Sequence, residues 1–169
     1  MELYDTVEKY MKDQTPSTLA EQLIKQIPIK AGDVLFEPFR GEGAFFNHFP
    51  ASCINHWTEI REGRDYRTFT EEVDWVISNP PFRMVAGKNC FYPLLKEFAP
   101  RVRKGICFLG DMNCLNSLTP LRQKELNGMG LYLTNITMCN VKRWRGRYFF
   151  LQFTKEKNET IGYLDGNFQ

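Results

Sequence analysis

The sequence predicts an open, doubly wound α/β sheet that is mostly parallel, with an antiparallel hairpin at its C-terminal edge. Short apolar runs alternate with helical segments along most of the chain, which is typical of a parallel sheet covered by helices. Two of these runs end in turns rich in glycine or proline. Two longer β-rich runs follow near the C-terminus, and the short gap between them suits a hairpin rather than a crossover.

The composition narrows the class of protein. The 169 residues suit a single domain spanning 1–169, with 1–14 and 155–169 peripheral. No apolar run approaches the roughly 20 residues that span a bilayer. The acidic N-terminus lacks a signal-peptide core, which predicts a cytoplasmic protein without membrane contact. Five scattered cysteines without a C-x-x-C pair, and only two histidines, predict no metal site.

The first expected element is a helix near residue 15. Thr15-Pro16 would supply an N-cap and a proline at the first helical position. Thr18 with Glu21 offers a competing capping-box start, and Pro28 ends the helix. The apolar positions that share one face of this helix are Leu19, Leu23, Ile24 and Ile27.

Three short strands are expected next. Residues 33–37 form an apolar run that leads into a glycine turn and then a helix over 44–49. Residues 54–60 predict a second strand that ends at Glu59, and 73–77 predict a third. Asn79-Pro80-Pro81 stops the third strand, because proline cannot donate a hydrogen bond to a sheet.

The C-terminal half continues the alternation. A helix is expected over 91–98, a strand over 105–109, and a helix that Thr119-Pro120 begins and Gly128 ends. The hairpin strands are 131–139 and 148–153. Because ligands bind at the carboxyl ends of such strands, the glycine turn and the proline loop are the expected site.

The glycine turn, Glu37-Pro38-Phe39-Arg40-Gly41-Glu42-Gly43, allows a backbone to approach a ligand closely. Its leading carboxylate suits a cationic or hydroxyl-bearing ligand, although a G-x-G turn alone is equally typical of an ordinary loop. Glu59 is placed to bind ribose hydroxyls, or is a solvated strand end. Asp65 could accept from an adenine amino group, or is a turn aspartate.

Asn79-Pro80-Pro81-Phe82 is the most specific feature of the sequence. An amino nitrogen conjugated to an aromatic ring attacks poorly, and two acceptors around it would favour its pyramidal, attacking form. Asn79 Oδ1 and the Pro80 carbonyl can be those acceptors. The prolines hold the carbonyl rigidly, and Phe82 can stack on a planar substrate. We interpret the tetrad as a catalytic loop rather than a rigid turn.

These features together resemble the Rossmann-like class I methyltransferases that use S-adenosylmethionine, and especially the N6-adenine DNA methyltransferases. Phe39-x-Gly41-x-Gly43 is similar to the cofactor motif of that family, and Asn79-Pro80-Pro81-Phe82 to its catalytic motif. Thr15-Pro16 resembles the N-terminal cofactor-side motif. The resemblance covers about residues 15–153 and implies a metal-free direct transfer of methyl to N6 of adenine.

The resemblance also implies roles for individual residues. Asn79, Pro80 and Pro81 would orient the target amino group, with Phe82 stacked on the base. Glu59 would bind the ribose of the cofactor. The other residues assigned to the cofactor are Thr15, Pro16, Glu37, Pro38, Phe39, Gly41, Gly43, Asp65 and Tyr66.

Two departures from the family pattern keep alternatives open. No insertion is long enough to be a target-recognition segment, and the stretch between Glu59 and Val73 leaves room only for a vestigial strand. DNA of a bacterial or phage-infected cell is the favoured substrate, with a partner subunit for target recognition. RNA adenine, a protein glutamine, and a catalytically silent nucleic-acid-binding subunit are the alternatives.

Two basic groups complete the expectations. Lys142, Arg143, Trp144, Arg145 and Arg147 mix cations with an aromatic ring, which suits phosphates and unstacked bases, or is a solvated hairpin tip. A second group, Arg101, Arg103 and Lys104, is interpreted as a solvated turn.

Overall fold

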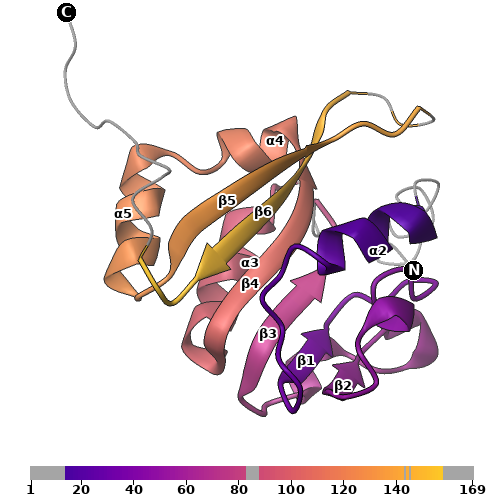
Figure 1. Cartoon of the computed structure of the whole chain (residues 1–169). Coiled ribbons are helices and arrows are strands. Elements are labelled where there is room, and N and C mark those ends of the chain that lie inside the picture. Colours follow the sequence, from indigo (N-terminus) through magenta and orange to yellow (C-terminus); the bar gives the residue numbers. More distant parts are fainter. Residues whose placement is uncertain (1–13, 83–87, 143, 145, 158–169) are drawn as a thin grey trace, which may run out of the picture.

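The fold is a six-stranded sheet with helices on both faces, seen in a computed structural model that describes residues 14–82, 88–142, 144 and 146–157 (Figure 1). The strand order is β2-β1-β3-β4-β6-β5. The strands are β1 (Val34–Glu37), β2 (Ile54–Trp57), β3 (Val73–Ser78), β4 (Val102–Asp111), β5 (Tyr132–Cys139) and β6 (Tyr148–Thr154). The α-helices of the described part are α2 (Ser17–Ile24), α3 (Phe91–Phe98), α4 (Met112–Asn116) and α5 (Pro120–Gly128).

Strand directions confirm the predicted sheet and refine its edge. Strand β1 pairs in parallel with β2 and β3, and β3 pairs in parallel with β4. Strand β6 is antiparallel to both β4 and β5. The hairpin therefore forms as expected, but its reversed strand is inserted inside the sheet, and the edge strand β5 runs in the same direction as β4.

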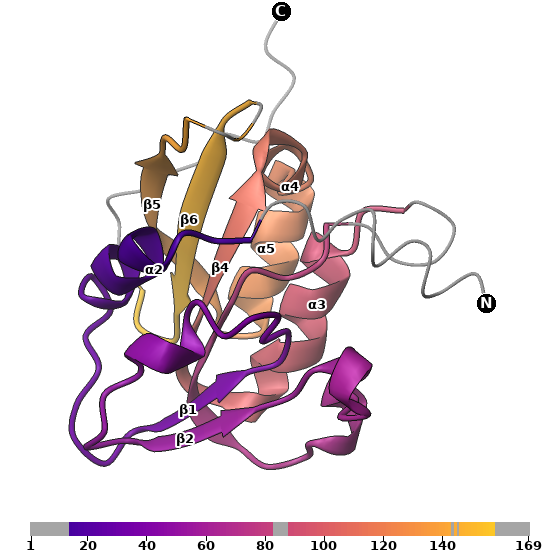
Figure 2. The same cartoon turned by 90° about the vertical axis from the view of Figure 1, so that its right-hand side faces the viewer.

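Neighbouring residues of each central strand point to opposite faces and build two cores. Phe36 and Ile106 face the core that contains α3 and the end of α5, whereas Leu35 and Cys107 face the core that contains α2. Figure 2 shows this arrangement, with α2 on one side of the sheet and α3, α4 and α5 on the other. Cys107 and Cys139 are both buried in the core that contains α2.

Several element boundaries differ from the expectation. Helix α2 begins at Ser17 with Pro16 as N-cap and no side-chain capping bond, so neither expected helix start is correct. The helix expected over 44–49 is one 3₁₀ turn, Phe46–His48. Helix α3 has the expected bounds, and Thr119 caps α5 by accepting a hydrogen bond from Arg122 N–H.

The basic group before β4 is not a solvated turn. Arg103 lies within β4 and donates from Nε and Nη2 to the Asp74 carboxylate, both at 3.1 Å. Lys104 donates to Asp33, and Arg101 donates to the Phe69 carbonyl. These groups tie together the amino ends of the strands, which is the edge opposite the expected site. Sequence alone hid this because both acids come from distant segments.

The Asp74–Arg103 pair predicts a pH-dependent contribution to stability. The hydrogen bond from Arg103 holds the pKa of Asp74 below its ordinary value, against the opposing effect of burial. Its stabilisation is therefore present above the unfolded-state pKa of about 3.9 and is lost as the pH falls through the lowered folded-state pKa. Asp74→Asn should reduce the free energy of unfolding by about 1–3 kcal/mol at neutral pH, measured by urea unfolding.

That difference should begin to shrink below about pH 4, where unfolded Asp74 becomes protonated, and should vanish once the pH has fallen through the lowered folded-state pKa. Glu21→Gln is the matched control, since Glu21 pairs with Lys25 on an exposed helix face. It should change the free energy of unfolding far less than Asp74→Asn does, because solvent screens an exposed pair. An Asp74→Asn effect equal to that control would contradict the prediction.

Candidate functional site

The site lies where the strand order reverses, at the carboxyl ends of β1 and β3. The chain leaves β1 towards β2 on one side, and β3 pairs on the other side of β1. Such switch points are the usual ligand sites of open α/β sheets. The glycine turn and the proline loop meet there, because Ser78 Oγ donates to the Phe39 carbonyl at 3.3 Å.

The glycine turn needs its glycines. Gly41 and Gly43 have φ values of 53° and 86°, which side chains with a Cβ rarely adopt. The turn closes through a hydrogen bond from Gly43 N–H to the Arg40 carbonyl, 2.8 Å long. Pro38 and Gly43 are buried. Neither glycine adds a side chain to the turn, although the side chains of Gln14 and Asn47 lie beside Gly41 and Gly43.

Glu37 is a buried acid at the tip of β1, with 1% of its surface exposed. Its Oε2 accepts from Phe46 N–H at 2.7 Å. Burial raises the pKa of Glu37 well above its ordinary value, while that hydrogen bond and the charge of Arg40 oppose the rise. A cationic or hydroxyl-bearing ligand beside it would supply the compensation that a buried carboxylate lacks.

Asn79 presents an unpaired acceptor. Its Nδ2 donates to Thr15 Oγ1 at 3.1 Å, and Thr15 is itself 7% exposed. In this orientation of the amide, the nitrogen is paired with Thr15 and Oδ1 is left as the acceptor. Asn79 Oδ1 is buried and has no hydrogen-bond partner among the described residues. Because buried polar atoms are usually satisfied, an orphaned carbonyl oxygen in this position indicates a missing donor.

The rest of the loop leaves a second acceptor. Cys90 donates from its backbone N–H to the Phe82 carbonyl and from its thiol to the Pro81 carbonyl. Within the described part of the chain, no donor reaches the carbonyl of Pro80, a buried residue. The Phe82 ring is half-buried, with its centroid 6.2 Å from that of Tyr148 on β6.

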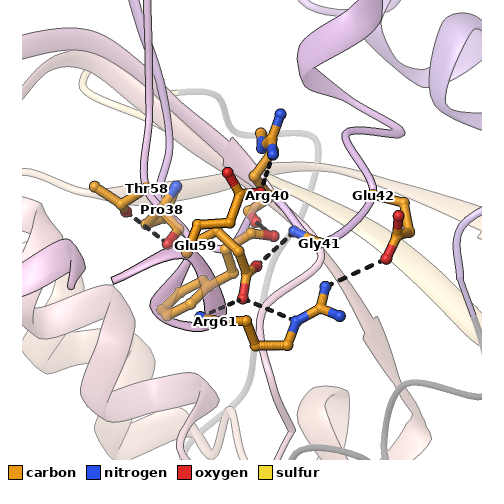
Figure 3. Close-up of polar contacts among 10 residues, drawn as sticks. Pro38, Arg40, Gly41, Glu42, Thr58, Glu59 and Arg61 are labelled. Atoms are coloured by element: carbon orange, nitrogen blue, oxygen red, sulfur yellow. Dashed lines mark hydrogen bonds and ion pairs between the residues drawn. The ribbon is translucent and has the colours of Figure 1, made fainter. Parts of the chain in front are cut away.

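Glu59, the expected ribose acid, is engaged by the chain itself (Figure 3). Its Oε2 accepts from Gly41 N–H at 2.7 Å, which joins it to the glycine turn. Its Oε1 accepts from Arg61, from the backbone N–H and from Nε, both at 3.2 Å. Glu59 lies two residues beyond the end of β2 rather than within it.

A group of residues beside Glu59 was missed by sequence reasoning. Trp57 ends β2, and the guanidinium carbons of Arg40 and Arg64 lie 3.8 and 3.9 Å from its ring centroid. Two guanidinium groups cannot share one ring face, so they enclose the indole. Thr58 Oγ1 also donates to the Pro38 carbonyl at 2.8 Å. Through these contacts the glycine turn packs against the end of β2 and the residues that follow it.

Asp65 has the geometry of its alternative interpretation, a turn aspartate. It caps the 3₁₀ turn Tyr66–Thr68 by accepting from Arg67 N–H, and it pairs with the Arg67 guanidinium. Tyr66 nevertheless reaches the glycine turn, because its ring centroid lies 4.9 Å from that of Phe39. Burial raises the pKa of Tyr66 to about 12.

The basic segment is brought only partly to the surface. Lys142 and Arg147 are exposed. Trp144, expected to contact nucleic acid, is instead buried in the core with 6% of its surface exposed, and its ring packs 4.4 Å from that of Tyr148. The expectation of an exposed tryptophan is therefore wrong. Arg143 and Arg145 lie outside the described residues.

Among the described residues, no group of three or more histidine, cysteine, aspartate or glutamate side chains could hold a metal ion. None of their helices is long and apolar enough to cross a membrane.

The fold is similar to that of solved methyltransferases. A proposed RNA methyltransferase from Pyrococcus horikoshii has a TM-score of 0.64 at 15% identity, over 86% of this chain and 87% of that chain. A proposed class I S-adenosylmethionine-dependent methyltransferase from Listeria monocytogenes has a TM-score of 0.63 at 12% identity, over 92% and 64%. Magnesium protoporphyrin IX methyltransferase from Synechocystis, solved with bound S-adenosylhomocysteine, has a TM-score of 0.56 at 9% identity, over 90% and 94%.

No protein-family model matches the sequence, and no curated protein matches it. The structural similarity establishes that this chain has the class I methyltransferase fold. At such low identities the activity of those proteins does not transfer with the fold.

Proposed function

We propose that this chain is an S-adenosylmethionine-dependent methyltransferase that acts on the N6 amino group of adenine in nucleic acid, with DNA as the favoured substrate. One observation carries the proposal. Asn79 Oδ1 is a buried acceptor that no donor of the described residues reaches, at the carboxyl end of β3 in a methyltransferase fold. An exocyclic amino group is a donor that would satisfy it.

The chemistry follows from the two acceptors of the loop. Asn79 Oδ1 and the Pro80 carbonyl would each bind one hydrogen of the target amino group. Holding both hydrogens out of the ring plane directs the nitrogen lone pair towards an electrophile. The Thr15 hydroxyl keeps the Asn79 amide from rotating, so the acceptor is oriented before the substrate arrives.

The residues of the glycine turn fit the cofactor. S-adenosylmethionine supplies an electrophilic methyl group on a sulfonium. Gly41 and Gly43 add no side chain to the turn, which would let the methionine portion approach its backbone, and the buried Glu37 carboxylate suits the cationic groups of the cofactor. Glu59 is the acid nearest to the end of β2 and would bind the ribose.

RNA is the second candidate substrate. The similarity to a proposed RNA methyltransferase over most of both chains favours it. No target-recognition insertion separates the predicted elements, which also favours a partner subunit that selects the target. Both substrates share the same acceptor chemistry, because adenine presents the same amino group in DNA and RNA.

Methyl transfer to mixed acceptors tests the proposal. The purified chain is incubated with labelled S-adenosylmethionine and with DNA, RNA or protein, and the products are hydrolysed to nucleosides and amino acids. We expect label in N6-methyladenine nucleosides, with deoxyribonucleoside the larger product. Label in the ribonucleoside alone would transfer the proposal to RNA. Label in glutamine, or cofactor binding without any labelled adenine, would overturn it.

A further inference from the structure

Glu59 has few acceptor positions left for a ligand. A carboxylate offers about four lone-pair positions. The chain fills three of them, with Gly41 N–H on Oε2 and with two N–H groups of Arg61 on Oε1. Glu59 is 7% exposed, so solvent does little to weaken these bonds. Among the described residues, no second donor reaches Oε2, which therefore retains an open position.

Of these three bonds, the one from Arg61 Nε is the one that can be released. The other two come from the backbone N–H groups of Gly41 and Arg61, which the fold holds in place. The Arg61 side chain is 32% exposed, and its Nη2 also approaches Glu42 Oε1 at 3.4 Å, where Glu42 is 68% exposed. Arg61 therefore has a second acidic partner at the solvent side of the turn, as Figure 3 shows.

We propose that Arg61 competes with the ribose hydroxyls of an adenosine-containing cofactor for Glu59, and so lowers the affinity of the chain for that cofactor. This inference rests on the proposed function. Two ribose hydroxyls need two acceptor positions on Glu59. The open position on Oε2 accepts the first hydroxyl, and the second requires Arg61 Nε to leave Oε1. Arg61 then remains paired with Glu42.

The competition predicts a difference between two ligands. S-adenosylhomocysteine carries both ribose hydroxyls, whereas its 2′-deoxy analogue carries one. The analogue fits the open position without displacing Arg61. Removing the Arg61 guanidinium should therefore strengthen binding of the first ligand and leave binding of the second unchanged.

Calorimetric titration of both ligands into the natural chain and into Arg61→Met tests this. Methionine keeps much of the side-chain length and removes the donors. The dissociation constant for S-adenosylhomocysteine should fall about twofold to fivefold, as expected for release from a partly exposed ion pair. This gain in affinity should become smaller when the salt concentration is raised from about 0.05 M to about 0.5 M, because salt screens the competing Arg61–Glu59 pair.

Lys25→Gln is the matched control, because it removes one positive charge from an exposed pair on α2. It should change neither dissociation constant. Arg61→Gln, a polar replacement, should show the same pattern as Arg61→Met: tighter binding of S-adenosylhomocysteine and unchanged binding of the 2′-deoxy analogue. Equal or weaker binding of S-adenosylhomocysteine by both Arg61 variants would overturn the inference, as would an equal gain for both ligands. If the natural chain and both Arg61 variants bind neither ligand, the proposed function fails, and the inference fails with it.

Discussion

Asn79→Ala should abolish methyl transfer and leave cofactor binding almost unchanged. In the proposed function, Asn79 Oδ1 accepts from the target amino group, so its loss would remove an interaction made during the transfer rather than in binding. We expect kcat to fall by at least about 10²-fold, measured with labelled S-adenosylmethionine at saturating substrate. The dissociation constant of the cofactor should change by less than about twofold.

Two further variants make this result specific. Thr15→Val keeps Asn79 but removes the hydroxyl that holds its amide, so kcat should fall less, by about tenfold. Asn135→Ala, on the exposed edge strand β5, should leave kcat unchanged. A parallel loss of kcat and cofactor affinity in Asn79→Ala would instead place Asn79 in the cofactor site.

Gly105→Ala should destabilise the fold more than the addition of a methyl group at any other glycine of the sheet. Gly105 lies on β4 between Trp75 of β3 and Thr154 of β6. An added Cβ would come 2.3 Å from the Phe153 carbonyl oxygen and 2.8 Å from Trp75 Cζ3. Since the first of these atoms is backbone, relief requires the strands to separate. We expect the free energy of unfolding to fall by at least about 3 kcal/mol in urea.

Gly128→Ala is the matched control. Gly128 ends helix α5, and an added Cβ there meets no atom within 4 Å. Alanine should be neutral or slightly stabilising, by up to about 1 kcal/mol, because it restricts the unfolded chain. If Gly105→Ala and Gly128→Ala unfolded within about 1 kcal/mol of each other, the close approach of β4 and β6 would be contradicted.

Local patterns predicted the strands, the central helices and the proline loop well. Helix α3 and the cap of α5 depend on neighbouring residues, so a sequence window contains the information that forms them. The start of α2 was missed because Thr15 forms its hydrogen bond with Asn79, 64 residues away, instead of capping the helix. Local capping rules have no access to such a partner.

In the candidate site, too, some contacts could be predicted from neighbouring residues and others could not. The acids Glu59 and Asp65 were visible in the sequence, but the arginine two residues after each of them was not recognised as its partner. That spacing is a local signal, and it could have been used. The enclosure of Trp57 by Arg40 and Arg64 could not have been predicted in this way, because Arg40 comes from the glycine turn, which follows a different strand.

The sequence by itself determined the order of strands and helices, the glycine turn after β1 and the proline loop Asn79-Pro80-Pro81-Phe82 after β3, because backbone propensity and side-chain type are local properties. Only the tertiary structure decided which acceptors remain unpaired. It placed the Thr15 hydroxyl on Asn79 Nδ2 and Arg61 on Glu59, and it buried Trp144. Satisfaction of a polar atom depends on which donors the packed chain brings within about 3 Å of it, and packing joins residues that are far apart in sequence.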